Sequence, residues 1–533
     1  MFLQRIGNRG IRLGTLFDRA ARRHPTNTVT LDHDLDIAPG AGRRLTLVQL
    51  ADLVDDFASR LWAAGVRPKD HVVVHKSDGF DISLLAVVAA RIGAIPVLLS
   101  PKLDGATVTE LLRRVGSPYL VTDQAKLDGE LPHEVFALSR SVLLTSGTHP
   151  EATTLASLAG AERVPAVAMP ATHPTLVTHT SGTTGIPKLA VHTGRSFQAR
   201  YRPQATVIKA ILGRREPVAI HVSFVHSRMF TAMPISLLQG HPLMILGDDE
   251  PESVATLFGR TPPGFIEAHP NTFLRWEVLA DDPRRPLAGV KYFSSTFDAI
   301  HPRTVHRLLR ASHRRKPRFA QAYGQSEVGP IAGRTYAPKD GASFDGRCVG
   351  VPFPGMTGVR VVSRNGEPVT KTNPGFIEVR SDGRIVTYLG EHARWQKQVN
   401  DGWWRMGDLG YRTRRGCLHL LDREVDEIPG VSSTLEIEDR LFTRLPELIE
   451  VIIVHGRDGR PQPVISTRDD KPLDRAAWDA AVGDLVEMAA PVQWRLSDLP
   501  QTATTKIKRL ELARLIESGV TGISPDTGKD VSV

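Results

Sequence analysis

A run of small hydroxylated residues between glycines, within Val177 to His192 (VTHTSGTTGIPKLAVH), is the most informative stretch of this 533-residue chain. A strand-like segment leads into the run, so backbone N–H groups and hydroxyls can converge on phosphate oxygens while Lys188 adds a positive charge. The GxxxxGK[ST] nucleotide loop is excluded, because Pro187 precedes the lysine and no Ser or Thr follows it. A flexible surface turn is the alternative for a short Ser/Thr/Gly run, but the full string favours phosphate binding. The predicted phosphate-binding residues are Thr180, Ser181, Gly182, Thr183, Thr184 and Lys188.

The same string resembles the phosphate-binding loop of the adenylate-forming enzymes, which comprise acyl-CoA synthetases, peptide-synthetase adenylation domains and firefly luciferase. Further along the chain, Gln321 to Gly329 (QAYGQSEVG) is similar to the Y-G-x-[ST]-E segment of that family. The resemblance implies that Tyr323 stacks on adenine, that Ser326 contacts a nucleotide phosphate and that Glu327 holds Mg²⁺. Gly324 belongs to the same nucleotide-binding segment. A carboxylate beside substrate phosphates suits a hard cation such as Mg²⁺.

Asp401 to Tyr411 (DGWWRMGDLGY) is similar to the W-x-x-T-G-D segment of the family. The resemblance implies that Asp408 accepts hydrogen bonds from both ribose hydroxyls, for which a carboxylate has enough acceptor sites. Met406 replaces the usual Thr, so we expect one nucleotide contact to be missing. Arg423 occupies the position of the family's Arg just before the inter-domain hinge, which implies that it reaches the ribose or a phosphate.

Leu499 to Arg509 (LPQTATTKIKR) resembles the C-terminal P-x-T-x-x-G-K-x-x-R segment. The resemblance implies that Lys506 bridges the carboxylate and the α-phosphate during adenylation, where one anion attacks another and a cation must lie between them. His226, in VSFVHSRMF, lies where the family places an aromatic or His gate beside the acyl pocket. A packed histidine is the alternative for a lone His.

Three departures from the family pattern bear on the reaction. Roughly three residues are missing after Ile428 by motif alignment, and Pro429 replaces the common Lys there, so the hinge residue is either Val425 or Asp426. Thr505 replaces the glycine before the lysine, and a β-branched residue resists the positive φ that glycine allows. The third departure is a bulkier turn at the expected acyl pocket, whose candidate residues are His226, Ser295, Phe297 and Asp298.

The acidic member of this turn, Asp298, would repel a carboxylate substrate unless paired or protonated. The alternative is that Asp298 caps the following helix with its side chain outward.

The composition, 41% apolar and 23% charged, is that of a soluble globular chain and excludes global disorder, collagen-like repetition and a small disulfide scaffold. The net charge of +9 is small for this length, and its scattered basic residues favour anionic small ligands over nucleic acid. With only Cys348 and Cys417 we expect no disulfide framework and a reducing compartment. The longest apolar stretch, Ile82 to Leu99, is interrupted by Arg, Gly and Pro, and no signal peptide precedes it, so we expect a cytoplasmic chain without membrane insertion.

The elements that must position these residues alternate between helix and strand. Apolar residues recur at helical spacing over 47–61, and a β-branched strand follows at 71–75 (HVVVH). Such alternation predicts an α/β fold with a mainly parallel, helix-covered sheet. After about Gly341 short strands separated by turns predict an antiparallel barrel or small sheet, and the tail past Asp422 predicts helices around a hairpin.

We therefore predict, with the family resemblance, a large N-terminal domain of two helix-flanked mainly parallel sheets plus a small β-barrel, and a small mobile α+β C-terminal domain. The boundaries are 1–421 for the AMP-binding domain, 422–426 for the hinge and 427–533 for the mobile domain.

The resemblance implies an acyl-CoA ligase that uses ATP, Mg²⁺ and coenzyme A, makes an acyl-AMP from a carboxylic acid and passes the acyl group to CoA. Lys506, Glu327 and His226 would be its catalytic residues. Two alternatives remain: a variant that only thioesterifies an acyl-AMP supplied by a separate adenylating enzyme, and an acyl-AMP ligase that loads a separate carrier protein. A homodimer is compatible with each. A non-enzymatic nucleotide sensor would bind ATP without turnover.

Overall fold

Helices and strands alternate in the computed structural model, which describes residues 10–180, 185–212, 215–296, 299–342, 344–502 and 506–520. The predicted helix is α3 (Leu47–Ala63), and it begins at a capping box in which the side chains of Thr46 and Gln49 bond to each other's backbone N–H groups. The longest apolar stretch, Ile82 to Leu99, forms the buried helix α4 (Asp81–Arg91) and the buried strand β4 (Ile95–Leu98).

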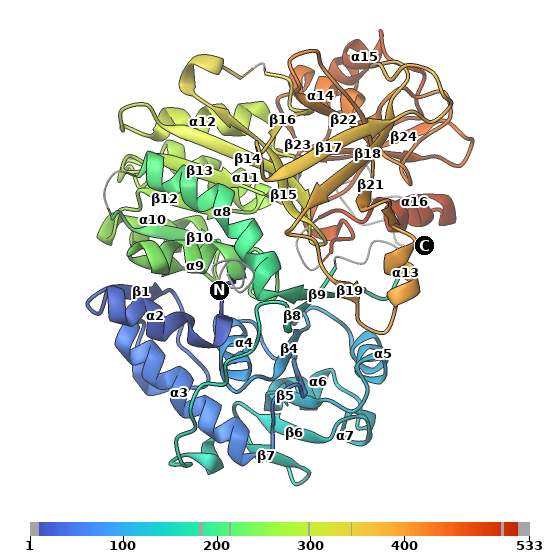
Figure 1. The fold of residues 1–533 in the computed structure, drawn as a ribbon. Helices are drawn as coiled ribbons and strands as arrows, with labels where there is room; N and C mark the ends of the chain where they lie inside the picture. Colours follow the sequence, from blue (N-terminus) through green and yellow to red (C-terminus); the bar gives the residue numbers. More distant parts are fainter. Residues whose placement is uncertain are drawn as a thin grey trace.

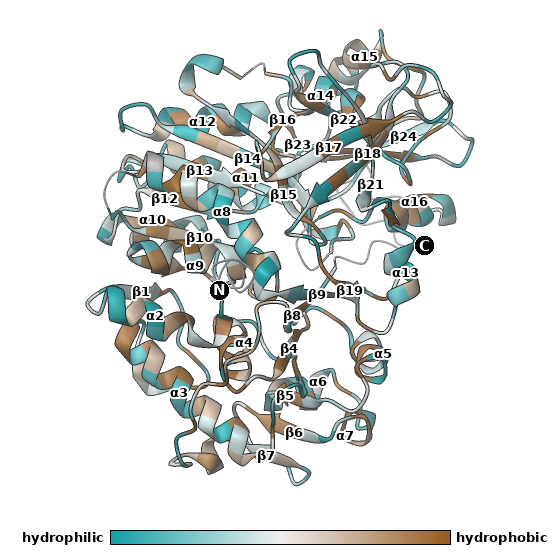
Figure 2. Ribbon diagram, in the orientation of Figure 1, coloured by the Kyte–Doolittle hydropathy of each residue, from teal (hydrophilic) through white to brown (hydrophobic). Residues whose placement is uncertain are grey.

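The first sheet has eight strands in the order β19-β9-β8-β4-β3-β5-β6-β7, and its central strands are parallel (Figure 1). Its remaining strands are β3 (His71–Val74), β5 (Tyr119–Thr122), β6 (Ser141–Leu144), β7 (Ala152–Thr154), β8 (Pro174–His179), β9 (Leu189–Thr193) and β19 (Thr387–Tyr388). Helices of this part of the chain are α2 (Leu16–Arg23), α5 (Gly105–Val115), α6 (Gln124–Gly129) and α7 (Glu134–Leu138). Apolar residues concentrate in the strands and on the helix faces that meet them, as expected for a sheet buried on both faces (Figure 2).

The second sheet has 14 strands, and its parallel half follows the order β14-β13-β12-β10-β11-β1. These strands are β1 (Thr28–Leu31), β10 (Val218–His221), β11 (Leu243–Ile245), β12 (Phe265–Ala268), β13 (Tyr292–Ser295) and β14 (Arg318–Gln325), with β2 (Arg44–Thr46) at the edge. The helices of this part are α8 (Gly194–Ile211), α9 (Met229–Gln239), α10 (Pro251–Arg260), α11 (Pro270–Arg275) and α12 (Pro302–Ala311). Two helix-flanked, mainly parallel sheets are therefore present, as predicted.

The predicted antiparallel strands are present, but they begin at residue 329, before the predicted start near Gly341. They continue the second sheet along the path β17-β18-β21-β22-β16-β15. They are β15 (Gly329–Tyr336), β16 (Cys348–Pro352), β17 (Thr357–Val362), β18 (Gly375–Ser381), β20 (Val399–Asn400), β21 (Trp403–Arg412) and β22 (Leu418–Arg423), with α13 (His392–Gln396) between them. Strand β19 leaves this region to pair with β9, so the chain joins the two large sheets beside the phosphate loop.

The C-terminal part contains a three-stranded sheet of β23 (Leu448–His455), β24 (Pro461–Thr467) and β25 (Val492–Gln493), with α14 (Thr434–Arg444), α15 (Arg475–Val482) and α16 (Arg509–Ser518). The predicted hairpin is confirmed in β23 and β24. The spacing of Trp478, Val482, Leu485 and Ala489 predicts one helix through all four residues, but α15 ends at Val482, directly before Gly483.

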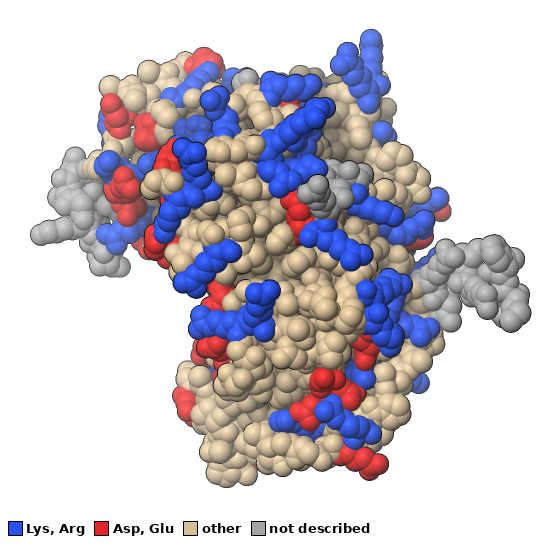
Figure 3. Space-filling model, turned by 90° about the vertical axis from the view of Figure 1, so that its left-hand side faces the viewer, with Lys and Arg blue, Asp and Glu red and all other residues tan. Residues whose placement is uncertain are grey.

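The two cysteines correct one prediction. Cys348 and Cys417 form a disulfide across β16 and the start of β22, although we expected none, because the fold brings together residues 69 positions apart. Among the described residues no helix has the length and apolar character needed to cross a bilayer. Figure 3 shows Lys and Arg in separate groups over one face, with Asp and Glu between them, which agrees with the scattered charge of the sequence.

The buried carboxyl of Asp422, in the predicted hinge, links β22 to α14 by accepting a hydrogen bond of 3.0 Å from Thr434 N. Burial raises the pKa of Asp422 to about 7, above its ordinary value. The folded chain therefore keeps this proton where the unfolded chain has lost it, so this group makes stability fall as pH rises from about 4 to about 7.

We expect Asp422→Asn to flatten this part of the pH dependence. Thermal unfolding midpoints of wild type and variant, measured from pH 4 to pH 8, should converge at low pH and separate in favour of the variant towards pH 7. Asp426→Asn is the matched control and should keep the wild-type slope. Parallel curves for wild type and Asp422→Asn would contradict the assignment.

Candidate active site

The base of the predicted phosphate loop is closed by two hydrogen bonds between its ends. Thr180 N donates to Lys188 O at 2.9 Å, and Lys188 N donates to Thr180 Oγ1 at 3.3 Å. The antiparallel pair β8 and β9 positions both ends, as the strand-like flanks predict. Four of the predicted phosphate-binding residues, Ser181, Gly182, Thr183 and Thr184, lie outside the described residues.

Lys188, Glu327 and Tyr388 form one polar cluster at the end of β8 and β9. Lys188 Nζ lies 3.1 Å from Glu327 Oε1 and 3.0 Å from Tyr388 Oη, and Tyr388 Oη donates to the same Glu327 oxygen at 2.6 Å. Burial alone would raise the pKa of Glu327, but the Lys188 charge and these hydrogen bonds outweigh it, so the pKa is lowered. The predicted metal ligand is therefore a buried carboxylate held in its ionised form. Tyr388 was not predicted, since nothing in its local sequence marks it.

We expect Tyr388→Phe to weaken binding of Mg·ATP about tenfold, because a hydrogen bond to a charged group contributes roughly 1.5–3 kcal/mol. Isothermal titration with Mg·ATP measures the affinity independently of turnover. The matched control is Tyr336→Phe, which removes a tyrosine hydroxyl whose 3.3 Å hydrogen bond goes to Gln321 rather than to this cluster. Equal affinities for Tyr388→Phe and wild type would show that Tyr388 does not position Glu327.

The residues predicted to bind the ribose also lie together in the structure. Tyr323 Oη donates to Asp408 Oδ2 at 2.5 Å, and Arg423 Nε lies 3.7 Å from Asp408 Oδ1. The ladder between β21 and β22 places Asp408 directly opposite Arg423, which explains how residues 15 positions apart meet. Burial raises the pKa of Asp408 above its ordinary value, and the Arg423 charge opposes that shift. Gly324 lies in β14 at a register shift between Tyr323 and Gly324.

The predicted gate, His226, contacts the predicted phosphate-binding residue Ser326, with 3.1 Å between His226 Nε2 and Ser326 Oγ. Burial and the neighbouring Arg200 lower the pKa of His226 to about 3, so its imidazole is neutral at physiological pH. Arg200 is buried and was not predicted; its guanidinium donates to Ser326 O at 2.9 Å and to Gly383 O at 2.8 Å. It therefore holds the loop that carries Ser326 and Glu327.

Lys506 approaches the same site. Its charge contributes to lowering the pKa of His226, after burial and Arg200, and it opposes the burial-driven rise in the pKa of Asp408. Lys506 thus lies close enough to the predicted nucleotide residues for its charge to act on them. Lys506 N donates to Thr502 Oγ1 at 3.1 Å. Thr505 lies outside the described residues.

The expected acyl-pocket turn is described only in part, since Phe297 and Asp298 lie outside the described residues. Ser295, at the carboxyl end of β13, is fully buried, and its hydroxyl has no hydrogen-bond partner among the described residues. The next hydroxyl, Thr296 Oγ1, is likewise buried and unpaired there. These two buried hydroxyls could form hydrogen bonds with a polar ligand.

A buried ion pair lies on the neighbouring strand, because Glu267 in β12 pairs in register with Ser294 in β13. The Arg228 guanidinium, two residues after His226, contacts both carboxylate oxygens of Glu267 in β12, and the two side chains are 7% and 1% exposed. His269, two residues beyond Glu267, is also buried, and both burial and nearby charges, that of Lys506 among them, lower its pKa well below the ordinary value. None of these three residues was predicted, because no local motif marks these positions.

Comparisons with known proteins identify the family of the chain. The family model of the AMP-binding enzymes matches residues 17–389. The chain is 48% identical over 531 residues to 3-amino-2-hydroxy-4-methoxybenzoate diazotase of Streptomyces cremeus, with 95% of this chain and 96% of the relative covered. It is 25% identical to 3-aminoavenalumate diazotase of a Streptomyces species, with 83% and 81% covered.

Among solved structures, an anthranilate–CoA ligase in complex with anthranoyl-AMP has a TM-score of 0.80 at 17% identity, with 96% of this chain and 98% of that chain covered. That likeness shows a shared fold of two helix-flanked sheets with a smaller C-terminal part, as predicted. Together with the family match it confirms the resemblance read from the four sequence segments. The chain belongs to the AMP-binding family of adenylate-forming enzymes.

Proposed function

We propose that this protein is an ATP-dependent diazotase that converts the amino group of an aromatic amino acid of the aminobenzoate type into a diazo group. The observation that carries the proposal is the 48% identity, over 95% of this chain, to a diazotase of an amino-hydroxybenzoate. The proposed reaction forms an N–N bond instead of transferring an acyl group to CoA, and it uses an adenylate intermediate as in the family.

Nitrite suits this site as the source of the second nitrogen atom of the diazo group, because it is a bent oxyanion like a carboxylate. A nitrite oxygen bonds to the α-phosphorus of ATP while the bond to pyrophosphate breaks, which leaves a mixed anhydride of nitrous acid and AMP. Two anions must approach each other in this step, so a cation between them lowers the barrier. Lys506 is the residue for this role, since its charge acts on His226 and Asp408.

The aromatic amine then attacks the nitrosyl nitrogen, the N–O bond breaks and AMP leaves. One amine proton passes to water, and the resulting N-nitrosamine tautomerises to a diazohydroxide. The diazohydroxide takes up one proton on its hydroxyl and loses water to form the diazonium group. His226 supports this step by positioning, because its pKa of about 3 keeps the imidazole neutral beside Ser326, 3.1 Å away. The unpaired hydroxyls of Ser295 and Thr296 are suited to orient polar groups of the ring.

Mg²⁺ fits this site by the chemistry of its donors, since buried, ionised Glu327 offers a carboxylate beside the place of the phosphates. Glu327 would hold the ion, and the ion would neutralise charge on the pyrophosphate leaving group. Consumption of ATP favours the cytoplasm as the place of action.

The second candidate is the acyl-CoA ligase that the sequence resemblance implies, with a carboxylic acid, ATP and CoA as substrates. It is favoured by the four segments that resemble those of adenylate-forming enzymes, since they suit a carboxylate as well as nitrite. The shortened segment after Ile428, with Pro429 in place of Lys, argues against it, because in the family that loop borders the pantetheine tunnel. Thioesterification of a supplied acyl-AMP and loading of a carrier protein are variants of this candidate.

The deciding experiment offers the purified protein ATP, Mg²⁺ and a panel of 3-aminobenzoates, with and without nitrite and with and without CoA. A diazotase forms AMP only when nitrite is present, and nitrogen-15-labelled nitrite shifts the product mass. An aromatic coupling reagent then yields an azo dye from the same samples.

An acyl-CoA product that forms without nitrite would overturn the diazotase proposal in favour of the ligase. Synthetic acyl adenylates offered with CoA, without ATP, identify the variant that only thioesterifies. ATP binding without turnover under every condition would instead indicate a nucleotide sensor.

A further inference from the structure

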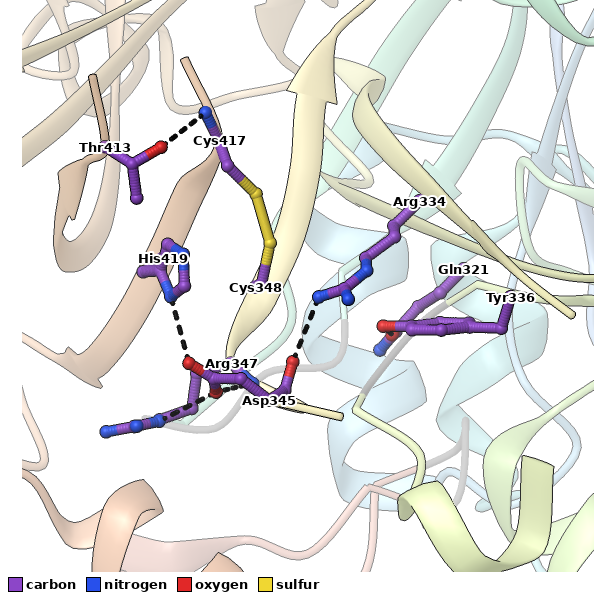
Figure 4. The surroundings of a disulfide bond; sticks show 9 residues. All are labelled: Gln321, Arg334, Tyr336, Asp345, Arg347, Cys348, Thr413, Cys417 and His419. Carbon is purple, nitrogen blue, oxygen red and sulfur yellow. Dashed lines mark hydrogen bonds and ion pairs between the residues drawn. A yellow bond between two sulfur atoms is a disulfide. The ribbon is translucent and has the colours of Figure 1, made fainter. Parts of the chain in front are cut away.

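Two cysteines and a histidine gather at the junction of β16 and β22, away from the residues assigned to nucleotide binding (Figure 4). Cys348 begins β16 and pairs in register with His419, while Cys417 directly precedes β22. A ring nitrogen of His419 and the two sulfur atoms lie within 4.8 Å of one another. Cys348 is buried, and the other two side chains are half-buried, so the cluster is reachable from solvent.

The side chain of His419 is oriented by residues that are not part of the cluster. His419 Nδ1 lies 3.2 Å from Asp345 Oδ2, an ion-pair contact without hydrogen-bond alignment, and the ring stacks on Tyr411 with 4.9 Å between centroids. Asp345 is itself held by Arg347, whose Nε lies 3.1 Å from Asp345 Oδ1 (Figure 4). With Nδ1 directed at a carboxylate, Nε2 is the nitrogen left for another ligand, which is the usual arrangement of histidines that bind zinc.

We propose that Cys348, Cys417 and His419 form a Zn²⁺ site when their disulfide is reduced. Two thiolates and an imidazole are the donor set that Zn²⁺ prefers, and three protein ligands leave a fourth position for water at this half-buried place. Reduction by a phosphine breaks the S–S bond and gives two thiols, while phosphorus is oxidised and takes its oxygen from water. Zinc binding then releases the two thiol protons.

Both states of the cluster join β16 to β22, and β22 ends at the predicted hinge. Arg347, next to Cys348, also reaches Glu436 of α14, with 2.5 Å between Nη1 and Oε2. We therefore expect the contact between Arg347 and α14 to be the same in the oxidised and the zinc-bound protein. This inference is independent of the proposed function, because none of its residues belongs to the nucleotide site.

The test measures zinc in the full-length protein after reduction with a phosphine, incubation with Zn²⁺ and gel filtration. We expect one zinc per reduced chain and none per oxidised chain. Co²⁺ in place of Zn²⁺ should give a sulfur-to-cobalt charge-transfer band, a direct sign of thiolate ligands that needs no variant. Cys348→Ser and His419→Ala should lose stoichiometric binding, and Asp345→Asn should weaken it about 10- to 100-fold.

The matched control is His133→Ala, which removes an exposed histidine that lies 2.6 Å from a carboxylate oxygen of Glu151 and should leave zinc binding unchanged. Equal zinc content in oxidised and reduced protein would overturn the proposal. Full affinity in His419→Ala, or absence of the charge-transfer band from reduced wild type, would do the same. None of these results bears on the diazotase assay.

Discussion

Lys506→Ala is expected to lower kcat about 10²–10³-fold, the effect typical of removing one group that stabilises charge in a transition state. The loss should fall on the adenylation step, where Lys506 separates the attacking oxyanion from the α-phosphate. AMP formation under the diazotase conditions measures the rate, and isothermal titration with AMP measures nucleotide binding, which should change little because Tyr323, Asp408 and Glu327 remain.

Lys508→Ala is the matched control, since Lys508 lies two residues further on and its Nζ pairs with Glu511 at 2.9 Å. Its kcat should stay near that of wild type. A loss of less than about tenfold in Lys506→Ala would refute the role of this lysine. The same prediction holds for the ligase candidate, so the result tests adenylation rather than the choice between the two functions.

Arg228→Met is expected to destabilise the protein by about 3–5 kcal/mol, because it leaves the carboxylate of Glu267 buried without its countercharge. Glu267 is wholly buried, and the Arg228 guanidinium contacts both of its oxygens as well as Gln204 and Thr231. The thermal unfolding midpoint and the urea midpoint should both fall.

The double variant Arg228→Met/Glu267→Leu should recover most of that loss, since exchanging a buried ion pair for apolar side chains is often neutral or stabilising. Arg113→Met is the surface control. Arg113 pairs with Glu134 at 2.7 Å while both side chains are about half exposed, and its loss should leave both unfolding midpoints close to those of wild type. If the single and double variants are equally unstable, the charge of Glu267 is not the cause.

The sequence by itself determined the fold class, the family and the segments that form the candidate nucleotide site. Periodicity marked α3, β3 and the C-terminal hairpin, because burial of one face repeats at the spacing of the element. The predicted phosphate loop and the segments around Tyr323, Asp408 and Lys506 were recognised because each resembles a family segment of only a few consecutive residues. Local signals of this kind can be recognised in the sequence without knowledge of the fold.

Only the tertiary structure decided which distant residues complete the site. Tyr388 lies 200 positions from Lys188, Glu267 lies 39 from Arg228, and the paired cysteines lie 69 apart. Such contacts depend on strand order and register, which no local pattern encodes. The buried pair beside His226 and the zinc-ligand set of Cys348, Cys417 and His419 therefore emerged only when separate strands were placed side by side.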